Sequence, residues 1–113
     1  MDSCEQHPHL VRQARTKLVS LLNQQLADAF DLMTQTKFAH WNVKGPHFIG
    51  LHKLFDELAE LVEGHVDQMA ERVTALGGVA MGTARQVAAM SHTPEFPANT
   101  FKGMDVVAAL ADR

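Results

Sequence analysis

Apolar residues recur at steps of three and four over two long stretches of this chain, from about Val11 to His40 and from about Phe48 to Leu76. This spacing is the period of an amphipathic helix with one apolar side. It predicts two helices, the first about 45 Å long at about 1.5 Å per residue. The apolar positions are Val11, Ala14, Leu18, Leu22, Leu26, Ala29 and Met33, then Leu51, Leu54, Leu58, Leu61, Val62, Val66, Met69, Val73 and Leu76.

Turn-forming residues separate the two stretches and end the second. Residues 42–46, Asn-Val-Lys-Gly-Pro, predict a tight turn, and Gly77–Gly78 predicts the end of the second helix. A short helical pattern covers Thr83–Met90, a loop with two prolines follows, and Lys102–Arg113 has the pattern of the first turns of another helix. No stretch has the alternation of a β-strand.

Two long helices joined by a tight turn form a hairpin, which leaves part of each apolar stripe uncovered. A finished helical bundle needs further helices to cover both stripes, from another chain or from further sequence. The chain therefore predicts an all-α fold. Residues 1–9 are expected to be a polar tail and residues 10–113 a single domain, incomplete at its C-terminus.

Composition and charge narrow the class of protein. The chain has 113 residues, a formal net charge of −3 and a pI near 6.1. This charge disfavours a domain that binds DNA through a positive electrostatic field. Cys4 is the single cysteine, so no internal disulfide forms, and neither a signal peptide nor a membrane span is recognisable. We expect a cytoplasmic protein.

The second helix carries two pairs of metal-binding side chains. His52 and Asp56 are four residues apart, as are Asp67 and Glu71, so each pair lies one turn apart on the same face. At about 100° per residue, all four fall within a sector of roughly 100°, nearly opposite the apolar stripe. Taken alone, this pattern is better explained by the solvated face of an amphipathic helix than by a binding site.

The positions of the two pairs favour a shared site. Asp56 and Asp67 are about 16 Å apart along the axis, too far for one chain to hold a single ion with both. Both His52 with Glu71 and Asp56 with Asp67 are centred on residues 61–62. A second copy packed antiparallel across a twofold axis there would place each residue opposite its counterpart and create two equivalent sites.

The turn adds a fifth residue to this set. His40 and His52 lie six residues before and after Pro46, so folding the hairpin there brings the two imidazoles together. Each site would then hold two imidazoles and three carboxylates from two chains. This mixture suits iron or zinc, and the lack of cysteine ligands disfavours a closed structural zinc site.

Several segments together resemble the Dps family of mini-ferritins. They are residues 39–45 (Ala-His-Trp-Asn-Val-Lys-Gly), His52 with Asp56, residues 65–72 (His-Val-Asp-Gln-Met-Ala-Glu-Arg) and Leu-Gly-Gly at 76–78. The resemblance implies a ferritin-like four-helix bundle subunit. Of this fold, the chain supplies the first long helical hairpin, the short helix of the middle loop and the start of a third long helix. The family's last two helices are not completed within it.

The resemblance also implies an activity. His40, His52 and Asp56 would come from one subunit and Asp67 and Glu71 from its twofold mate, with Trp41 and Lys37 close by. Such a site is a ferroxidase that oxidises iron(II), mainly with hydrogen peroxide, and twelve subunits form a hollow shell that stores ferric mineral. Oxidative damage to DNA in the bacterial cytoplasm is thereby prevented, and association with the nucleoid is left open.

Two other interpretations fit the sequence less well. A non-catalytic helical oligomer that compacts or shields DNA fits poorly with the acidic balance, and the few basic residues near the start (Arg12, Arg15 and Lys17) predict weak DNA binding. A conventional ferritin builds its site from Glu-x-x-His motifs, and this chain has none. The other histidines are expected to be incidental or structural, and Cys4 inert. These histidines are His7, His9, His47, His65 and His92.

Overall fold

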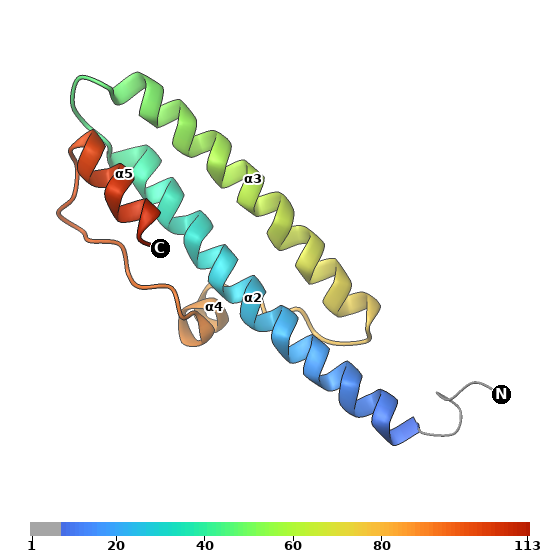
Figure 1. Ribbon diagram of the computed structural model, residues 1–113. Coiled ribbons are helices and arrows are strands. Elements are labelled where there is room, and N and C mark those ends of the chain that lie inside the picture. Colours follow the sequence, from blue (N-terminus) through green and yellow to red (C-terminus); the bar gives the residue numbers. More distant parts are fainter. Residues whose placement is uncertain (1–7) are drawn as a thin grey trace.

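The computed structural model describes residues 8–113 and contains four helices: α2 (Pro8–Asn42), α3 (Phe48–Ala75), α4 (Ala84–Met90) and α5 (Gly103–Ala111). Figure 1 shows α2 and α3 as a long hairpin, and the described part of the chain measures 65 × 22 × 20 Å. It contains no β-strand, so the all-α prediction is confirmed. Cys4 and His7, in the expected tail, lie outside the described residues.

The boundaries of the helices follow the local sequence. Helix α2 begins at Pro8, inside the expected tail, because proline is favoured at a first helical position. Gly45 has a φ of +109° in the turn before α3, and Gly77 has a φ of +82° just after α3; both are conformations that other residues rarely adopt. Thr83 caps α4 reciprocally with Gln86, each side chain accepting the other's backbone N–H.

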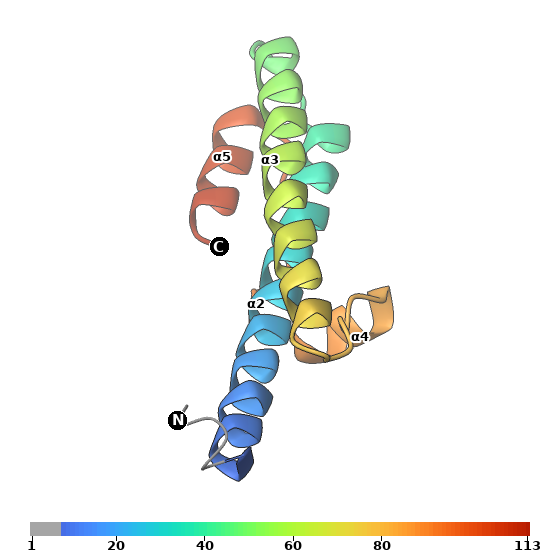
Figure 2. The ribbon, with the colours of Figure 1, turned by 90° about the vertical axis from the view of Figure 1, so that its right-hand side faces the viewer.

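Two clusters of buried side chains hold the helices together, one at each end of the hairpin overlap. Helices α4 and α5 lie on opposite sides of the hairpin (Figure 2). Near the turn, α5 covers a cluster centred on Phe55, which is 2% exposed. Farther along, α4 covers a second cluster through Val87. The clusters consist of Ala39, Val43, Phe55, Phe96 and Val106, and of Leu26, Val66 and Val87.

Polar side chains of α2 anchor the connection between α3 and α5. The buried Asn23 donates its amide N–H to the carbonyl of Val79 and accepts the N–H of Met81 (3.0 and 2.9 Å). The buried Gln35 donates to the carbonyl of Pro94 at 2.7 Å, and the Asp28 carboxylate accepts the N–H of His92. These bonds hold the long loop against α2.

A second apolar stripe of α3 remains uncovered within the described residues. Leu54, Leu58 and Leu61 are 44%, 39% and 61% exposed, respectively. The hairpin with α4 and α5 therefore leaves apolar surface that a complete bundle would bury, as the sequence pattern predicted. Within residues 8–113, no helix is long and apolar enough to cross a membrane.

Candidate metal centre

The two histidines on either side of the turn lie against each other. His40 is in the last turn of α2 and His52 in the second turn of α3. Their ring centroids are 3.7 Å apart, and the planes are inclined by 20°. The prediction that the hairpin brings His40 beside His52 is therefore confirmed.

Each imidazole is held by the backbone of the other residue. His40 Nδ1–H donates to the carbonyl oxygen of His52 at 2.5 Å, and His52 Nδ1–H donates to the carbonyl oxygen of His40 at 2.6 Å. A carbonyl oxygen can only accept a hydrogen bond, so both rings carry their proton on Nδ1. In the neutral ring, Nε2 then presents a lone pair, which is the form that binds metal ions.

The end of α2 explains why the carbonyl of His40 is available. In a continuing helix it would accept the N–H of Lys44, but that N–H donates to the carbonyl of Phe101 instead (2.8 Å). The carbonyls of a last helical turn need other partners, and the His52 imidazole supplies one. One hydrogen bond thus caps a helix and orients a ring.

Asp56, one turn beyond His52, is the third member of the cluster. Lys37 Nζ donates to its Oδ1 at 2.5 Å, and His40 Nε2 lies 4.0 Å from the same oxygen. The hydrogen bond from Lys37 is the main reason that the pKa of Asp56 lies below its ordinary value of 3.8. The positive charge of Lys37, with smaller effects of His40 and His52, lowers the pKa further, while partial desolvation opposes these effects. Asp56 is therefore anionic near neutral pH.

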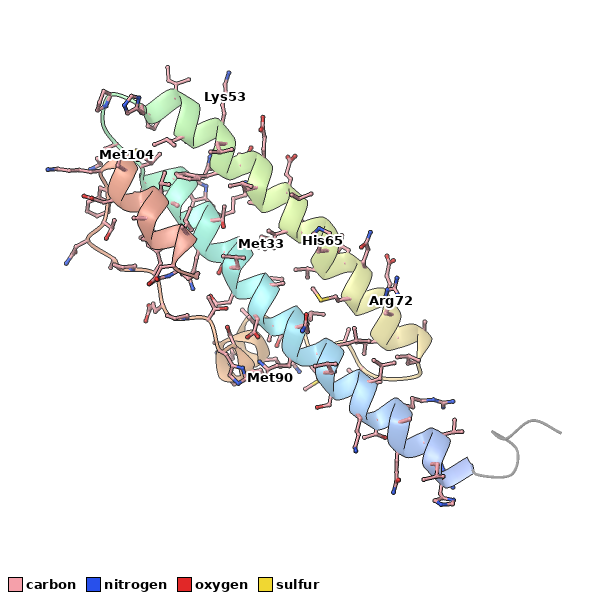
Figure 3. All side chains as sticks on the ribbon, in the orientation of Figure 1. Met33, Lys53, His65, Arg72, Met90 and Met104 are labelled. Atoms are coloured by element: carbon pink, nitrogen blue, oxygen red, sulfur yellow. The ribbon has the colours of Figure 1, made fainter. Side chains whose placement is uncertain are left out.

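Asp67 and Glu71 lie farther along α3 and do not join this cluster. Both are exposed, and neither carboxylate forms a hydrogen bond or ion pair within residues 8–113. In Figure 3, the labelled Lys53 directly follows His52 and the labelled Arg72 directly follows Glu71, so the two labels show how far apart these candidates lie along α3. Within the part of the chain that the structure describes, no three histidine, cysteine or carboxylate side chains form a group able to hold a metal ion.

Trp41 follows His40 in the chain, but its side chain is directed elsewhere. It is 67% exposed and makes no ring contact with either imidazole. Successive helical residues point about 100° apart, and Trp41 lines a surface groove of about 640 Å³ together with Phe38, Val87 and Phe96. Within one chain, the backbone of Trp41 therefore adjoins His40, but its side chain points away from the two imidazoles.

Sequence reasoning missed one residue of this region. The ring of Phe48 stacks on the imidazole of His52, with centroids 5.0 Å apart and planes inclined by 29°. The available signal was its position four residues before His52 on the same helix, a spacing that places side chains in contact. Three other histidines, His47, His65 and His92, are exposed, so the expectation of a surface position is confirmed for His92, whereas His65 does not lie on the buried side of α3.

Comparison with known proteins gives a consistent result. Residues 19–112 match the model of the ferritin-like domain. A DNA protection during starvation protein of Agrobacterium fabrum is 39% identical over 100 residues, which cover 88% of this chain and 62% of that protein. This chain thus spans less than two thirds of that relative's length.

Solved structures of Dps proteins share the fold. DpsA14 from Streptomyces coelicolor superposes with a TM-score of 0.83 at 35% identity, over 88% of this chain and 59% of the other. A Dps protein from Vibrio cholerae O1, described as a member of the ferritin-like diiron-carboxylate superfamily, gives a TM-score of 0.81 at 26% identity, over 87% and 61% of the two chains.

Proposed function

The chain belongs to the ferritin-like family, and within it to the Dps proteins; from this premise we propose that it oxidises iron(II) at sites shared by two twofold-related copies. The observation that carries the proposal is the half-site at the hairpin turn. There, His40 Nε2 lies 4.0 Å from the anionic Asp56, and His52, which stacks on His40, also carries its proton on Nδ1 and leaves Nε2 free to bind a ligand. Imidazole and carboxylate are suitable ligands for iron(II).

The separation within the half-site suits a metal ion. His40 Nε2 and Asp56 Oδ1 are 4.0 Å apart. A first-row divalent ion such as zinc makes bonds of about 2.0–2.2 Å to imidazole nitrogen and carboxylate oxygen, so one ion can reach both atoms. Lys37 donates to the same carboxylate oxygen and would compete with an ion bound there.

A second copy would complete each site. Asp67 and Glu71 are exposed and without partners in the described chain, and they lie symmetrically with Asp56 and His52 about residues 61–62. An antiparallel twofold contact would bring the partner's Asp67 and the partner's Glu71 to the half-site. Their two negative charges would then stabilise the iron(III) product more than iron(II).

The proposed oxidant is hydrogen peroxide. Two iron(II) ions each lose one electron, and one peroxide with two protons becomes two water molecules. This reaction consumes both reactants from which hydroxyl radicals form, so DNA would be protected without being bound. We further propose, from the family, a cytoplasmic shell of twelve subunits that stores the ferric product.

The test is peroxide-dependent oxidation of iron(II) by purified variants. His52→Ala and Asp56→Ala should each slow the reaction severely, because each removes a ligand. Matched controls on the same helix are His65→Ala and Glu57→Ala, whose side chains are exposed and outside the cluster. Full activity in both site variants, or equal losses in the controls, would disprove the site assignment.

A further inference from the structure

Two rings from different helices cover the imidazole of His52. Phe48, in the first turn of α3, stacks on it at 5.0 Å, and His40 of α2 stacks on it at 3.7 Å. No ring contact joins Phe48 to His40 themselves, so the two rings cover different parts of the imidazole. Its Nδ1 side is occupied by the bond to the carbonyl of His40, which leaves the Nε2 side for a ligand.

The turn sets the position of the Phe48 ring. The N–H of Phe48 donates to the carbonyl of Gly45 at 3.1 Å, which ties the start of α3 to the turn. Phe48 and His52 then lie one helical turn apart on the same side of α3. Phe48 is 41% exposed, whereas Phe55 is 2% exposed and belongs to the core cluster at this end, so packing against the core of the described chain does not explain the placement of Phe48.

We propose that Phe48 is a positioning residue that holds the His52 imidazole in the orientation in which Nε2 faces the metal ion. This inference rests on the proposed function in that it assigns His52 to a metal ion. The bond at Nδ1 does not by itself prevent the imidazole from tilting about that bond, and the stacked rings of His40 and Phe48 resist the tilt. A metal-bound imidazole also gains positive charge, which the face of a phenylalanine ring attracts.

Three variants of the 113-residue chain separate this role from a general structural one. Phe48→Leu removes the ring but keeps an apolar side chain, and Phe48→Tyr keeps an aromatic ring. Ile49→Ala is the matched control, because Ile49 is an aliphatic residue that is 68% exposed at the same end of the helix. Circular dichroism and sedimentation velocity check folding and assembly of each variant.

The first readout needs no metal. Long-range proton–nitrogen NMR spectra report which imidazole nitrogen carries the proton. His52 should be protonated on Nδ1 in the wild type, in Phe48→Tyr and in Ile49→Ala, and should become a mixture of the two forms in Phe48→Leu. His65, exposed and distant, serves as the internal reference in every spectrum.

The second readout is binding of Co²⁺, a divalent ion that peroxide-free buffer does not oxidise, measured by calorimetry at constant pH. Phe48→Leu should raise the dissociation constant about 2- to 10-fold, the range of aromatic pair contributions, while the other two variants stay within about twofold. Unchanged His52 signals and unchanged Co²⁺ binding in Phe48→Leu would overturn the proposal, as would an equal loss in Ile49→Ala.

Two controls keep the conclusions separate. If His52→Ala binds Co²⁺ as well as the wild type, the proposed function fails, while the metal-free NMR spectra still decide whether Phe48 orients the ring. If Phe48→Leu does not fold, Phe48→Met, with an unbranched apolar side chain, is measured in its place against the same two criteria.

Discussion

One face of α3 carries His52, Asp56, Asp67 and Glu71, and we call it the acidic face. Its two ends differ in how many neighbouring side chains a single chain provides. Near the turn, His52 and Asp56 are joined by His40, Lys37 and Phe48, and every one of these side chains has a neighbour. Toward the other end, Asp67 and Glu71 are exposed and unpaired in the described chain. The hairpin brings candidate side chains together where α2 passes close to α3, whereas the proposed site would need a second copy of the chain to supply Asp67 and Glu71.

The largest expected effect comes from breaking both ends in different chains. Asp56→Ala, and the double variant Asp67→Ala with Glu71→Ala, should each abolish iron oxidation in a homodimer, because every site takes residues from both chains. In a mixed dimer one site receives both intact halves. With random pairing about half the dimers are mixed, so about a quarter of wild-type activity should return.

Asp56→Ala is preferred here to the histidine variants, because both histidines also hold the hairpin through their carbonyl bonds. The measurement is initial-rate oxidation after the variants are mixed, with exchange of subunits verified by mass-tagged chains. Zero activity despite verified exchange would show that the site does not combine the two ends.

Next in size is a pair of glycine substitutions, one in the turn and one in the interior of α3. Gly45→Ala should lower the free energy of unfolding by about 1–2 kcal/mol, because its φ of +109° strains any side chain. Gly64→Ala, in the interior of α3 with nothing near the added carbon, should raise it by about 0.5–1 kcal/mol. Urea unfolding measures both, and equal effects of the same sign would contradict the assignment of the turn.

A smaller effect concerns the lysine that distinguishes the turn end. Lys37→Met should raise the pKa of Asp56 toward 3.8, because the hydrogen bond that lowers it is lost. A lowered pKa means that the ionised form contributes stability above pH 3.8, which is lost as the pH falls through the folded value. The wild type should therefore lose more stability than the variant below pH 3.8.

The side chains of Lys37 and Asp56 are 36% and 40% exposed, so solvent screens their interaction and this difference in stability should be small. Carbon-13 NMR titration of the Asp56 carboxyl group measures the pKa directly, and Lys53→Met, an exposed lysine of the same helix, is the control. If the two lysine variants shift the pKa of Asp56 equally, Lys37 has no specific effect on that pKa.

The smallest expected effect is on DNA. The acidic face of α3 repels phosphates. The net charge of −3 leaves no excess of basic side chains to neutralise phosphates and release the counterions of DNA. Duplex DNA should therefore bind poorly at physiological salt. Fluorescence anisotropy across a salt series tests this, and tight binding that weakens steeply with salt would contradict the prediction.

The sequence alone determined the helices, the turns and one contact across the hairpin. The spacing of apolar residues, the positions of glycines and the presence of turn-forming residues are local properties of the sequence. They therefore predicted the bounds of α2, α3, α4 and α5 to within a few residues. The contact between His40 and His52 followed from their equal distances from Pro46, since a tight turn imposes the register of two antiparallel helices. The symmetric spacing of Asp67 and Glu71 stays a prediction, because it concerns a second chain.

Only the tertiary structure decided how the side chains are oriented. The bonds between each imidazole and the opposite carbonyl, the stacking of Phe48 and the direction of Trp41 toward the α4 groove were not evident in the pattern. Each depends on side-chain rotamers and on the close approach of segments far apart in the chain. Helical period specifies the face on which a residue lies, whereas the partner across that face is set by the packing of the whole bundle.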